Sequence, residues 1–318
     1  MSQHPEGAAL VTLPDPDLLD GLGAAPDGLE LRLWDVGSPP ADALGDDAAR
    51  VAAVVLPYSS PASALRSLGE LPALRLVQSL SAGYDNLVGK LPAGVPFANG
   101  GGIHDASTSE LALGLVLASL RGLDDALRDQ EQARWRPRQH VGLADRRVLV
   151  LGTGGIGRAV TARLRPFEVD LVRVASSART DEDGVVHGVD ELPALLPDVD
   201  VVVVALPLSG STRGLVDAAF LAAMPEQSLL VNVGRGAVVD TDALVAELRA
   251  GRLRAALDVV DPEPLPEDHP LWGAPGVIIT PHVGGGTAAM RPRALALLRT
   301  QLQHLATGAE PVNLVDLG

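Results

Sequence analysis

Nine short runs rich in valine and leucine recur along the chain, and segments of helical pattern lie between most of them. The runs are residues 29–34, 51–56, 74–80, 147–151, 170–175, 201–206, 229–233, 254–259 and 277–280. Nearly continuous apolar strands are typical of a parallel sheet whose two faces are both covered by helices, as in repeated βαβ units. The alternation therefore predicts an α/β fold.

Two glycine-rich breaks interrupt this pattern. The chain has 318 residues, 47% of them hydrophobic, which is enough for two domains of ordinary size. Pro96 and the glycines at 100–102 precede a helical segment at 107–120, and the glycines at 284–286 precede another at 288–305, which ends before a glycine. We expect a hinge at each break, with the last helix returning to the first domain. The expected parts are residues 1–99, 100–287 and 288–318.

The charge balance and the missing cysteines exclude several classes of function. Lysine and arginine total 25 against 40 acidic residues, and Lys90 is the one lysine, so no basic stripe is available to bind a phosphate backbone. Cysteine is absent, which excludes a disulfide framework, a thiolate metal site and a cysteine nucleophile. The N-terminal residues do not resemble a signal peptide, and apolar runs such as 111–120 are too short to span a bilayer. We therefore expect a cytoplasmic protein that binds no nucleic acid, no membrane and no metal.

The most informative local motif is a glycine-rich turn between a strand-like run and a helical run at 158–164. In Gly152-Thr-Gly-Gly-Ile-Gly157, the first glycine permits a tight turn and Gly154 lets a pyrophosphate approach the backbone. Gly157 allows the helix to pack closely on the strand, and the helix N-terminus would face the anion. The motif predicts a dinucleotide site formed by Gly152, Thr153, Gly154, Gly155, Ile156 and Gly157. A glycine-rich turn that serves only to pack a helix on a strand is the alternative.

The residues after the next strand-like run bear on the choice of nicotinamide cofactor. NAD sites usually have an acidic residue there to bind the ribose hydroxyls, but this chain has Ser176, Ser177 and Arg179. Hydroxyls and a guanidinium suit a 2′-phosphate, so these residues favour NADP(H) over NAD(H). In the alternative, Asp181 or Glu182 reaches back to the ribose and the cofactor is NAD(H).

Three polar residues follow three other expected strands, at the edge of the sheet where ligands gather in open α/β folds. Arg235 lies between two glycines, Glu263 lies in a proline-rich loop, and His282 follows a proline. A guanidinium that binds a carboxylate, an imidazole that titrates near neutral pH and a carboxylate that orients it would form a working catalytic set. The alternatives are an Arg235 that closes a turn or pairs with Asp258, a solvated Glu263 and a structural His282.

Together these motifs resemble those of the D-isomer-specific 2-hydroxyacid dehydrogenases, a family that includes glyoxylate and hydroxypyruvate reductases. The segments that carry the resemblance are Ser81-Ala-Gly-Tyr-Asp85, the turn from Gly152 to Gly157, residues 206–214, residues 232–236, residues 258–266 and Pro281-His282. The resemblance implies a Rossmann-type cofactor domain inserted into a smaller, flavodoxin-like substrate domain. It also implies an oxidoreductase that moves a hydride between NAD(P)H and a small 2-oxoacid or D-2-hydroxyacid.

The resemblance also assigns roles to individual residues. His282 would exchange the proton on the substrate oxygen while the nicotinamide carries the hydride, and Glu263 would fix the imidazole tautomer. Arg235 would hold the substrate carboxylate and polarise the reacting carbonyl.

Other positions resemble ligand-binding segments of the family less specifically. Backbone N–H groups after the third strand-like run would bind the substrate carboxylate, and Asp258 would contact the nicotinamide carboxamide. These residues are Ser81, Ala82 and Gly83 for the substrate, and Leu206, Pro207, Thr212, Asn232, Val233, Asp258, His282 and Gly284 for the cofactor. Ordinary turns and packing are the alternatives.

Two other functions share this architecture. A cofactor-sensing binding protein, similar to the C-terminal binding corepressors, would be compatible with the same three catalytic residues. A formate or phosphite dehydrogenase is the second alternative. Among 2-oxoacids we expect glyoxylate, hydroxypyruvate or pyruvate, although a pocket distinguishes side chains that differ by one methylene only ~10- to 200-fold.

The nearly all-apolar segment 107–120 must be buried on more than one side. By family resemblance we expect it at a homodimer interface. A helix enclosed within the monomer is the alternative.

Overall fold

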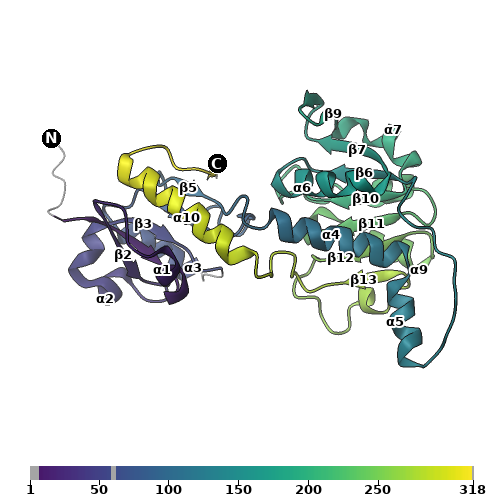
Figure 1. Cartoon of the computed structure of the whole chain (residues 1–318), viewed down its shortest axis with the longest axis horizontal. Helices are drawn as coiled ribbons and strands as arrows, with labels where there is room; N and C mark the ends of the chain where they lie inside the picture. The colour runs from purple at the N-terminus through teal and green to yellow at the C-terminus, as the bar shows by residue number, and fades with distance from the viewer. Residues whose placement is uncertain (1–6, 59–61, 317–318) are drawn as a thin grey trace. The chain divides into compact units, whose positions relative to one another are not determined.

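The computed structural model describes residues 7–58 and 62–316, and for residues 62–64 it describes the backbone alone. The chain forms two compact units (Figure 1). The first comprises the described residues of Met1–His104 and Ala288–Gly318, and the second comprises Asp105–Thr287. Within the described ranges, no helix is long and apolar enough to cross a membrane.

The first unit is built on a six-stranded sheet in the order β14-β5-β4-β3-β1-β2. Its strands are β1 (Ala9–Leu13), β2 (Leu29–Leu33), β3 (Val51–Val55), β4 (Leu76–Gln78), β5 (Phe97–Ala98) and β14 (Leu314–Val315). β14 pairs antiparallel with β5, and the other neighbours are parallel. The order β2-β1-β3-β4-β5 is that of flavodoxin-like sheets, which confirms the expected fold of this part.

Helices cover this sheet. They are α1 (Pro16–Leu22), α2 (Pro40–Leu44), α3 (Ala62–Ser67) and α10 (Met290–Thr307), with 3-10 turns at Gly45–Arg50 and Leu68–Glu70. Helix α10 brings the end of the chain back to the first unit, because its Leu298 belongs to the same buried cluster as Leu13 and Val55. It ends before Gly308, whose φ of 71° is left-handed and favours glycine.

The second unit is built on an eight-stranded sheet in the order β13-β12-β11-β10-β6-β7-β9-β8. Its strands are β6 (Arg147–Leu151), β7 (Asp170–Ala175), β8 (Arg179–Asp181), β9 (Gly184–Gly188), β10 (Val201–Val204), β11 (Leu229–Asn232), β12 (Arg254–Leu257) and β13 (Val277–Ile279). All neighbours are parallel except β8, which runs antiparallel to β9. The order β9-β7-β6-β10-β11-β12 is that of the Rossmann fold and confirms the expected cofactor-domain architecture.

The central strands of this sheet are buried on both faces. The helices are α4 (Asp105–Leu120), α5 (Leu123–Glu131), α6 (Gly155–Leu164), α7 (Leu192–Leu195), α8 (Ala218–Ala223) and α9 (Thr241–Arg249), with 3-10 turns at Arg165–Phe167, Val189–Glu191, Leu196–Asp198, Gly236–Val238 and Pro270–Gly273. Val148 of β6 shares an apolar cluster with Ala112 of α4 and Val160 of α6. Leu149, the next residue, belongs to the cluster on the other face with Leu244 of α9. Burial on alternate sides explains why these strands are continuously apolar.

Helix α4 packs along α6 and across β11 and β12 (Figure 1). Its Ala112, Leu115 and Val116 are buried in the monomer, whereas Glu110 and Gly114 are exposed. One side of α4 is therefore enclosed within the monomer and the other is not.

Two segments differ from the sequence-based expectation. The expected hinge near 97–103 begins with β5, which is buried in the first sheet. Residues 181–184 form the turn of the β8–β9 hairpin, which the apolar runs did not predict. The hairpin was missed because an edge strand is held by backbone pairing and needs no apolar run.

Candidate active site

The candidate site lies along one edge of the sheet in the second unit. The residues at which five neighbouring parallel strands end are paired in register, and they are Leu151, Val204, Asn232, Leu257 and Ile279. The glycine-rich turn, Arg235, Asp258 and His282 each follow closely on one of these strand ends. The sheet therefore gathers the expected segments at its carboxyl edge, where open α/β sheets bind ligands.

The glycine-rich turn joins β6 to α6, and two of its glycines are required by close contacts. Gly152 has a φ of 113°, and a Cβ there would lie 2.5 Å from the carbonyl oxygen of Ala205. A Cβ on Gly157 would lie 1.8 Å from the carbonyl oxygen of Gly152. At Gly154 an added Cβ would meet no described atom within 4 Å, so space remains beside the N-terminus of α6. Backbone N–H groups there attract a phosphate, and the residues present fit a dinucleotide.

The other residues of the turn have different surroundings. A Cβ on Gly155 would lie 2.2 Å from Asp105 Oδ2, so this glycine lets the N-termini of α4 and α6 approach each other. Ile156 packs against the apolar cluster beneath the sheet edge. Only the backbone of Ile156 can therefore contribute to the phosphate site.

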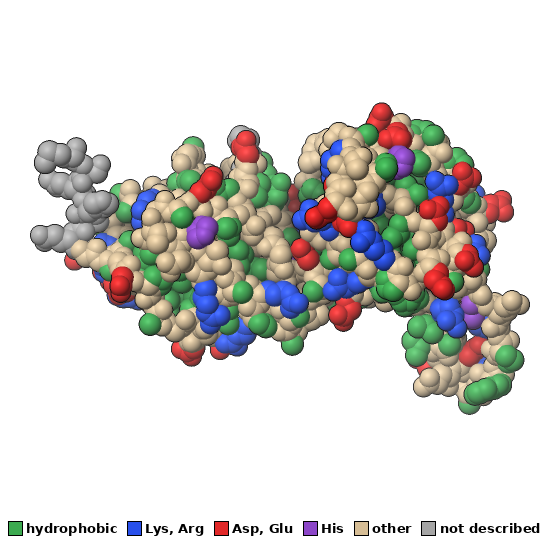
Figure 2. All heavy atoms as spheres, turned by 45° about the horizontal axis from the view of Figure 1, so that its top comes forward, with side chains coloured by type: hydrophobic (Ala, Val, Ile, Leu, Met, Phe, Trp, Pro, Cys, Tyr) green, Lys and Arg blue, Asp and Glu red, His purple; other side chains and the backbone are tan. Residues whose placement is uncertain are grey.

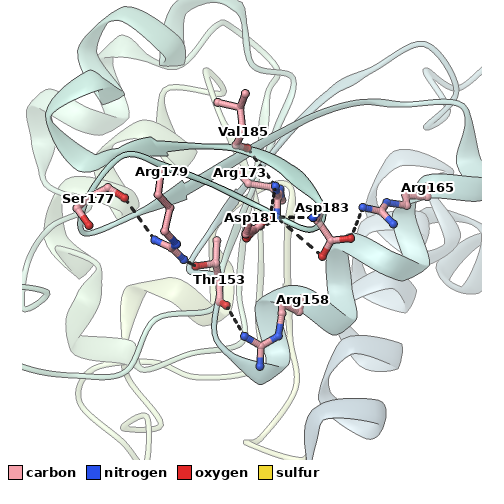
Figure 3. Close-up of polar contacts among 9 residues, drawn as sticks. All are labelled: Thr153, Arg158, Arg165, Arg173, Ser177, Arg179, Asp181, Asp183 and Val185. Carbon is pink, nitrogen blue, oxygen red and sulfur yellow. Dashed lines mark hydrogen bonds and ion pairs between the residues drawn. The ribbon is translucent and has the colours of Figure 1, made fainter.

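Thr153 lies between two guanidinium groups (Figure 3). Arg179 donates a 2.6 Å hydrogen bond to Thr153 Oγ1 and a 3.3 Å bond to the carbonyl oxygen of Ser177. Arg158, on α6, donates to the carbonyl oxygen of Thr153 at 3.4 Å. Ser176, Ser177 and Arg179 are exposed, so the edge beside Thr153 is positively charged and accessible.

The structure places Asp181 in another role. Arg173 donates to both of its carboxylate oxygens, at 3.1 and 2.8 Å, and these bonds hold the pKa of Asp181 below its usual range. Glu182 is exposed in the turn of the hairpin. Because a guanidinium already occupies both oxygens of Asp181, its binding to a ribose would require breaking this ion pair.

His282 and Glu263 are joined by a hydrogen bond between Nδ1 of the imidazole and Oε1 of the carboxylate. The two side chains are about half exposed, at 46% and 39%. With Nδ1 engaged, Nε2 is the ring nitrogen that can face a substrate. His282 has a φ of 53°, a left-handed value that is uncommon outside glycine and is often found at functional sites.

A buried carboxylate holds the loop that carries His282. Asp258 is 3% exposed, and its Oδ1 accepts from Thr280 Oγ1 at 2.6 Å and from the N–H of Val283 at 2.9 Å. Its Oδ2 accepts from the N–H of Gly284 at 2.9 Å, and its carbonyl oxygen accepts from the N–H of His282 at 2.8 Å. Asp258 therefore shapes the loop that carries His282, whereas its expected contact with the nicotinamide stays a prediction.

Arg235 occupies a turn that glycines make possible. A Cβ on Gly236 would lie 1.9 Å from the carbonyl oxygen of Val260, and one on Gly234 would lie 2.6 Å from that of Leu206. The buried Asn232 accepts from the N–H of Gly234 and donates to the carbonyl oxygen of Arg235, both at 3.0 Å. Asn232 thus fixes the backbone that presents the guanidinium.

The carboxylate of Asp258 accepts hydrogen bonds from Thr280, Val283 and Gly284. A pairing of Arg235 with Asp258 stays an alternative.

The remaining expected cofactor residues differ in exposure. Thr212 donates to the carbonyl oxygen of Pro207 at 2.7 Å and accepts from the N–H of Ser209 at 2.8 Å, which closes the loop after β10. Leu206 is half-buried, whereas Val233 is 4% exposed and lies in the core. Only the backbone of Val233 can therefore reach a ligand.

The expected substrate loop follows β4 in the first unit. The N–H of Ser81 donates to Ser79 Oγ at 3.0 Å, so it is already engaged. Asn99 Nδ2 donates to the carbonyl oxygen of Ala82 at 2.9 Å and so holds the loop in place. Ala82 and Gly83 keep N–H groups to which the described part of the chain assigns no acceptor. We therefore still expect the N–H groups of Ala82 and Gly83 to bind the anion, but not that of Ser81.

Comparisons with known proteins bear directly on this arrangement. Residues 113–284 match the model of the D-isomer specific 2-hydroxyacid dehydrogenase, NAD binding domain. A glyoxylate reductase from Aeropyrum pernix is 31% identical over 90% of both chains. The chain belongs to the D-isomer-specific 2-hydroxyacid dehydrogenase family.

Solved structures of other members agree with this assignment. A D-isomer specific 2-hydroxyacid dehydrogenase from Xanthobacter autotrophicus Py2, in complex with NADPH and MES, is 32% identical over 98% of both chains with a TM-score of 0.83. An NADPH-dependent glyoxylate/hydroxypyruvate reductase from Sinorhizobium meliloti, in complex with NADP and malonate, is 26% identical. It covers 98% of this chain and 97% of its own, with a TM-score of 0.77.

This dehydrogenase is accordingly an NAD(P)-dependent oxidoreductase that acts on 2-oxoacids and D-2-hydroxyacids. Its catalytic chemistry is a hydride transfer coupled to a proton transfer. In the ranges 7–58 and 62–316, no three His, Asp or Glu side chains come together as a metal site.

Sequence reasoning missed three residues of this dehydrogenase that shape the site. Arg158 directly follows the last glycine of the turn, and Thr280 precedes Pro281-His282, so their positions in the motifs were the available signals. Arg173 lies inside an apolar strand. Its role could not be predicted, because only the fold of the hairpin brings its partner Asp181 near it.

Proposed function

We propose that the dehydrogenase reduces a small 2-oxoacid of the glyoxylate or hydroxypyruvate kind, with His282 as the proton donor. The observation that carries the proposal is the hydrogen-bonded pair of His282 and Glu263 at the carboxyl edge of the Rossmann sheet. The names of the relatives from Aeropyrum pernix and Sinorhizobium meliloti support this substrate class.

The residues divide the reaction as follows. A bound reduced nicotinamide supplies the hydride that C2 of the 2-oxoacid receives. As the carbonyl bond becomes an alkoxide, His282 Nε2 donates a proton to the oxygen, and the product is a 2-hydroxyacid. Glu263 holds Nδ1 and keeps the ring oriented while its charge changes. The reverse reaction uses the same groups in the opposite sense.

Arg235 binds the substrate carboxylate in this proposal. Its guanidinium donates to the carbonyl oxygen of Gly234 at 2.9 Å, and the planar fork of a guanidinium matches a carboxylate. A charged planar donor also polarises the neighbouring carbonyl, which favours hydride addition. The N–H groups of Ala82 and Gly83, in the first unit, are donors of the kind that bind an anion. We propose that the first unit binds the substrate and the second binds the cofactor.

The proposal is tested by following the absorbance of NADPH or NADH with glyoxylate, hydroxypyruvate, pyruvate, formate and phosphite as separate substrates. We expect oxidation of reduced cofactor by a 2-oxoacid, and a loss of about 10²- to 10⁴-fold in kcat for His282→Asn with cofactor binding retained. His304→Asn, at the end of α10, is the matched control. Cofactor binding without turnover of any 2-oxoacid would favour the cofactor-sensing function instead, and NAD(P)⁺ reduction with formate or phosphite would favour those dehydrogenases.

We further propose that the dehydrogenase prefers NADP(H) to NAD(H). Arg179 and Arg158 converge on Thr153, beside the turn that receives the pyrophosphate, whereas the acidic Asp181 is engaged by Arg173. The solved relative from Xanthobacter autotrophicus Py2, in complex with NADPH, supports the same preference. A 2′-phosphate at this edge would meet donors, whereas the nearby carboxylate of Asp181 is bound by Arg173.

We propose that the dehydrogenase forms a homodimer through α5 and the segment that follows it. Four apolar residues there are 49–96% exposed, namely Leu123, Leu127, Trp135 and Val141. Figure 2 shows hydrophobic side chains on the surface of the projecting lobe at the lower right. Arg138 forms ion pairs with Asp125 at 3.3 Å and Asp129 at 2.9 Å, which hold the segment against α5. An apolar patch of this kind, presented by an ordered segment, is typical of an interaction surface.

Light scattering after size-exclusion chromatography tests the dimer. We expect Trp135→Ala with Leu127→Ala to shift the protein towards monomer, and Leu33→Ala, an exposed leucine of β2, to leave the mass unchanged. A wild-type monomer at micromolar concentration would refute the proposal.

A cytoplasmic location and the absence of nucleic-acid binding stay predictions.

A further inference from the structure

The strand that carries Arg179 is weakly attached to the sheet. β8 lies at the outer edge and pairs with β9 through three residues, Arg179 to Asp181. β9 in turn pairs with β7 through two residues, His187 and Gly188. Backbone pairing alone therefore gives this hairpin little support, although Arg179 is the proposed ligand of the 2′-phosphate.

A buried arginine supplies the missing support (Figure 3). The side chain of Arg173, on β7, is 5% exposed and donates to both carboxylate oxygens of Asp181, at 3.1 and 2.8 Å. It also donates to the carbonyl oxygen of Val185 at 3.2 Å, on the opposite strand of the hairpin. One guanidinium therefore binds both β8 and β9.

The turn of the hairpin is held as well. Asp183 pairs with Arg165 at 2.5 Å and lies 3.9 Å from Arg173, and its N–H donates to Asp181 Oδ1 at 2.9 Å. A buried guanidinium is unfavourable unless it is fully paired, so the hairpin and Arg173 stabilise each other's position. The pKa of Asp181 is lowered chiefly by its hydrogen bonds from Arg173, which keeps the carboxylate charged at neutral pH.

Asp181 and Arg179 are two residues apart on β8, so they leave the strand on the same side. Fixing Asp181 therefore also fixes the direction in which Arg179 extends towards Thr153. We propose that Arg173 and Asp181 are positioning residues for cofactor selectivity, which act by holding β8 so that Arg179 remains beside the 2′-phosphate site. The inference rests on the proposed role of Arg179 in NADP(H) binding.

Whether neutralising Asp181 strengthens or weakens NADPH binding distinguishes a positioning role from a purely electrostatic one. If Asp181 acted only through its charge, neutralising it would remove a repulsion and strengthen NADPH binding. If it anchors β8, neutralising it weakens NADPH binding, because Arg179 loses its fixed position. NADH lacks the 2′-phosphate, so its binding should not change in either case.

The experiment measures dissociation constants for NADPH, NADH, 2′,5′-ADP and 5′-AMP by isothermal titration calorimetry, together with thermal unfolding. We expect Arg179→Ala to weaken NADPH and 2′,5′-ADP by about 10- to 100-fold, and NADH and 5′-AMP hardly at all. We expect Asp181→Asn to weaken the 2′-phosphorylated ligands by roughly 3- to 10-fold and to leave the other two unchanged. Arg173→Lys, which keeps the charge but loses the bidentate geometry, should have the same selective effect.

Two further variants complete the test. Asp190→Asn removes a carboxylate from the exposed turn after β9, and it should not weaken the 2′-phosphorylated ligands. In an Arg179→Ala background, Asp181→Asn should cause no further loss of selectivity, because the residue through which it acts is already gone.

The outcomes distinguish the proposed role of Arg179 from the positioning role of Arg173 and Asp181. An Arg179→Ala variant that keeps its preference for NADPH overturns the proposed role of Arg179 itself. If Arg179→Ala loses the preference but Asp181→Asn keeps or strengthens it, the positioning inference is overturned. Equal weakening of all four ligands by Asp181→Asn, or a selective loss of the same size in Asp190→Asn, also overturns it.

Discussion

Replacement of Asp258 by asparagine is expected to destabilise the loop that carries His282. Oδ1 of the carboxylate accepts two hydrogen bonds and Oδ2 accepts one, from the N–H of Gly284, and the side chain is buried. If the amide oxygen takes the place of Oδ1, the amide NH₂ faces the N–H of Gly284, and two donors meet. A buried donor left without an acceptor costs about 1–3 kcal/mol.

This loss of stability can be converted into an expected decrease in Tm. For a domain of 150–250 residues, each kcal/mol lowers the Tm by about 2–4 °C, so Asp258→Asn should unfold roughly 2–12 °C below the wild type. The same substitution should lower kcat. The N–H of His282 donates a hydrogen bond to the carbonyl oxygen of residue 258, and the N–H of Val283 in the same loop donates to the carboxylate.

The assay is thermal unfolding followed by circular dichroism, combined with steady-state kinetics. Asp261→Asn is the matched control, because Asp261 lies three residues further on and is exposed. Its Tm should stay close to that of the wild type. If Asp258→Asn and Asp261→Asn both unfolded within about 1 °C of the wild type, the role assigned to Asp258 would be wrong.

Three other predictions follow from single contacts. Gly157→Ala should abolish dinucleotide binding in calorimetry or prevent soluble expression, because the new Cβ would lie 1.8 Å from the carbonyl oxygen of Gly152. Asn232→Ala should raise the KM for the 2-oxoacid several-fold more than the Kd for NADPH, since the lost amide fixes the turn of Arg235, and equal changes in both constants would count against it. The lowered pKa of Asp181 means that its ion pair stabilises the fold above the unfolded value of 3.8 and that this contribution is lost as the pH falls through the folded value. The Tm of Asp181→Asn should therefore fall less than that of the wild type between about pH 5 and pH 2, and parallel curves would refute this.

Nine of the strands could be predicted from the sequence alone. Each of the nine apolar runs contains a strand of the structure, because strands buried on two faces must be continuously apolar. The glycine-rich turn could also be predicted, since no other residue fits at Gly152 or Gly157. The other five strands in the described part of the chain, β1, β5, β8, β9 and β14, lie outside these runs. β5, β8 and β14 have only two or three residues each, and their pairing depends on backbone partners that a local pattern does not identify.

Within the candidate site, the identity of the chemically important residues came from the sequence, and their partners came from the structure. The resemblance assigned Glu263 to His282 and Asp258 to the nicotinamide, and in one alternative Asp181 reached the ribose. In the fold, Glu263 binds His282, Asp258 binds the backbone of the loop that carries His282, and Asp181 binds Arg173.

The sequence by itself determined the fold class, the glycine-rich turn and the set of residues whose chemistry suits moving a proton or binding an anion. These properties depend on hydrophobic period, glycine geometry and side-chain chemistry, which are local. Only the tertiary structure decided which carboxylate is paired and which guanidinium remains beside the cofactor turn. A charged side chain takes the partner that folding brings near it, and that partner lies on another strand or loop whose position no local pattern specifies.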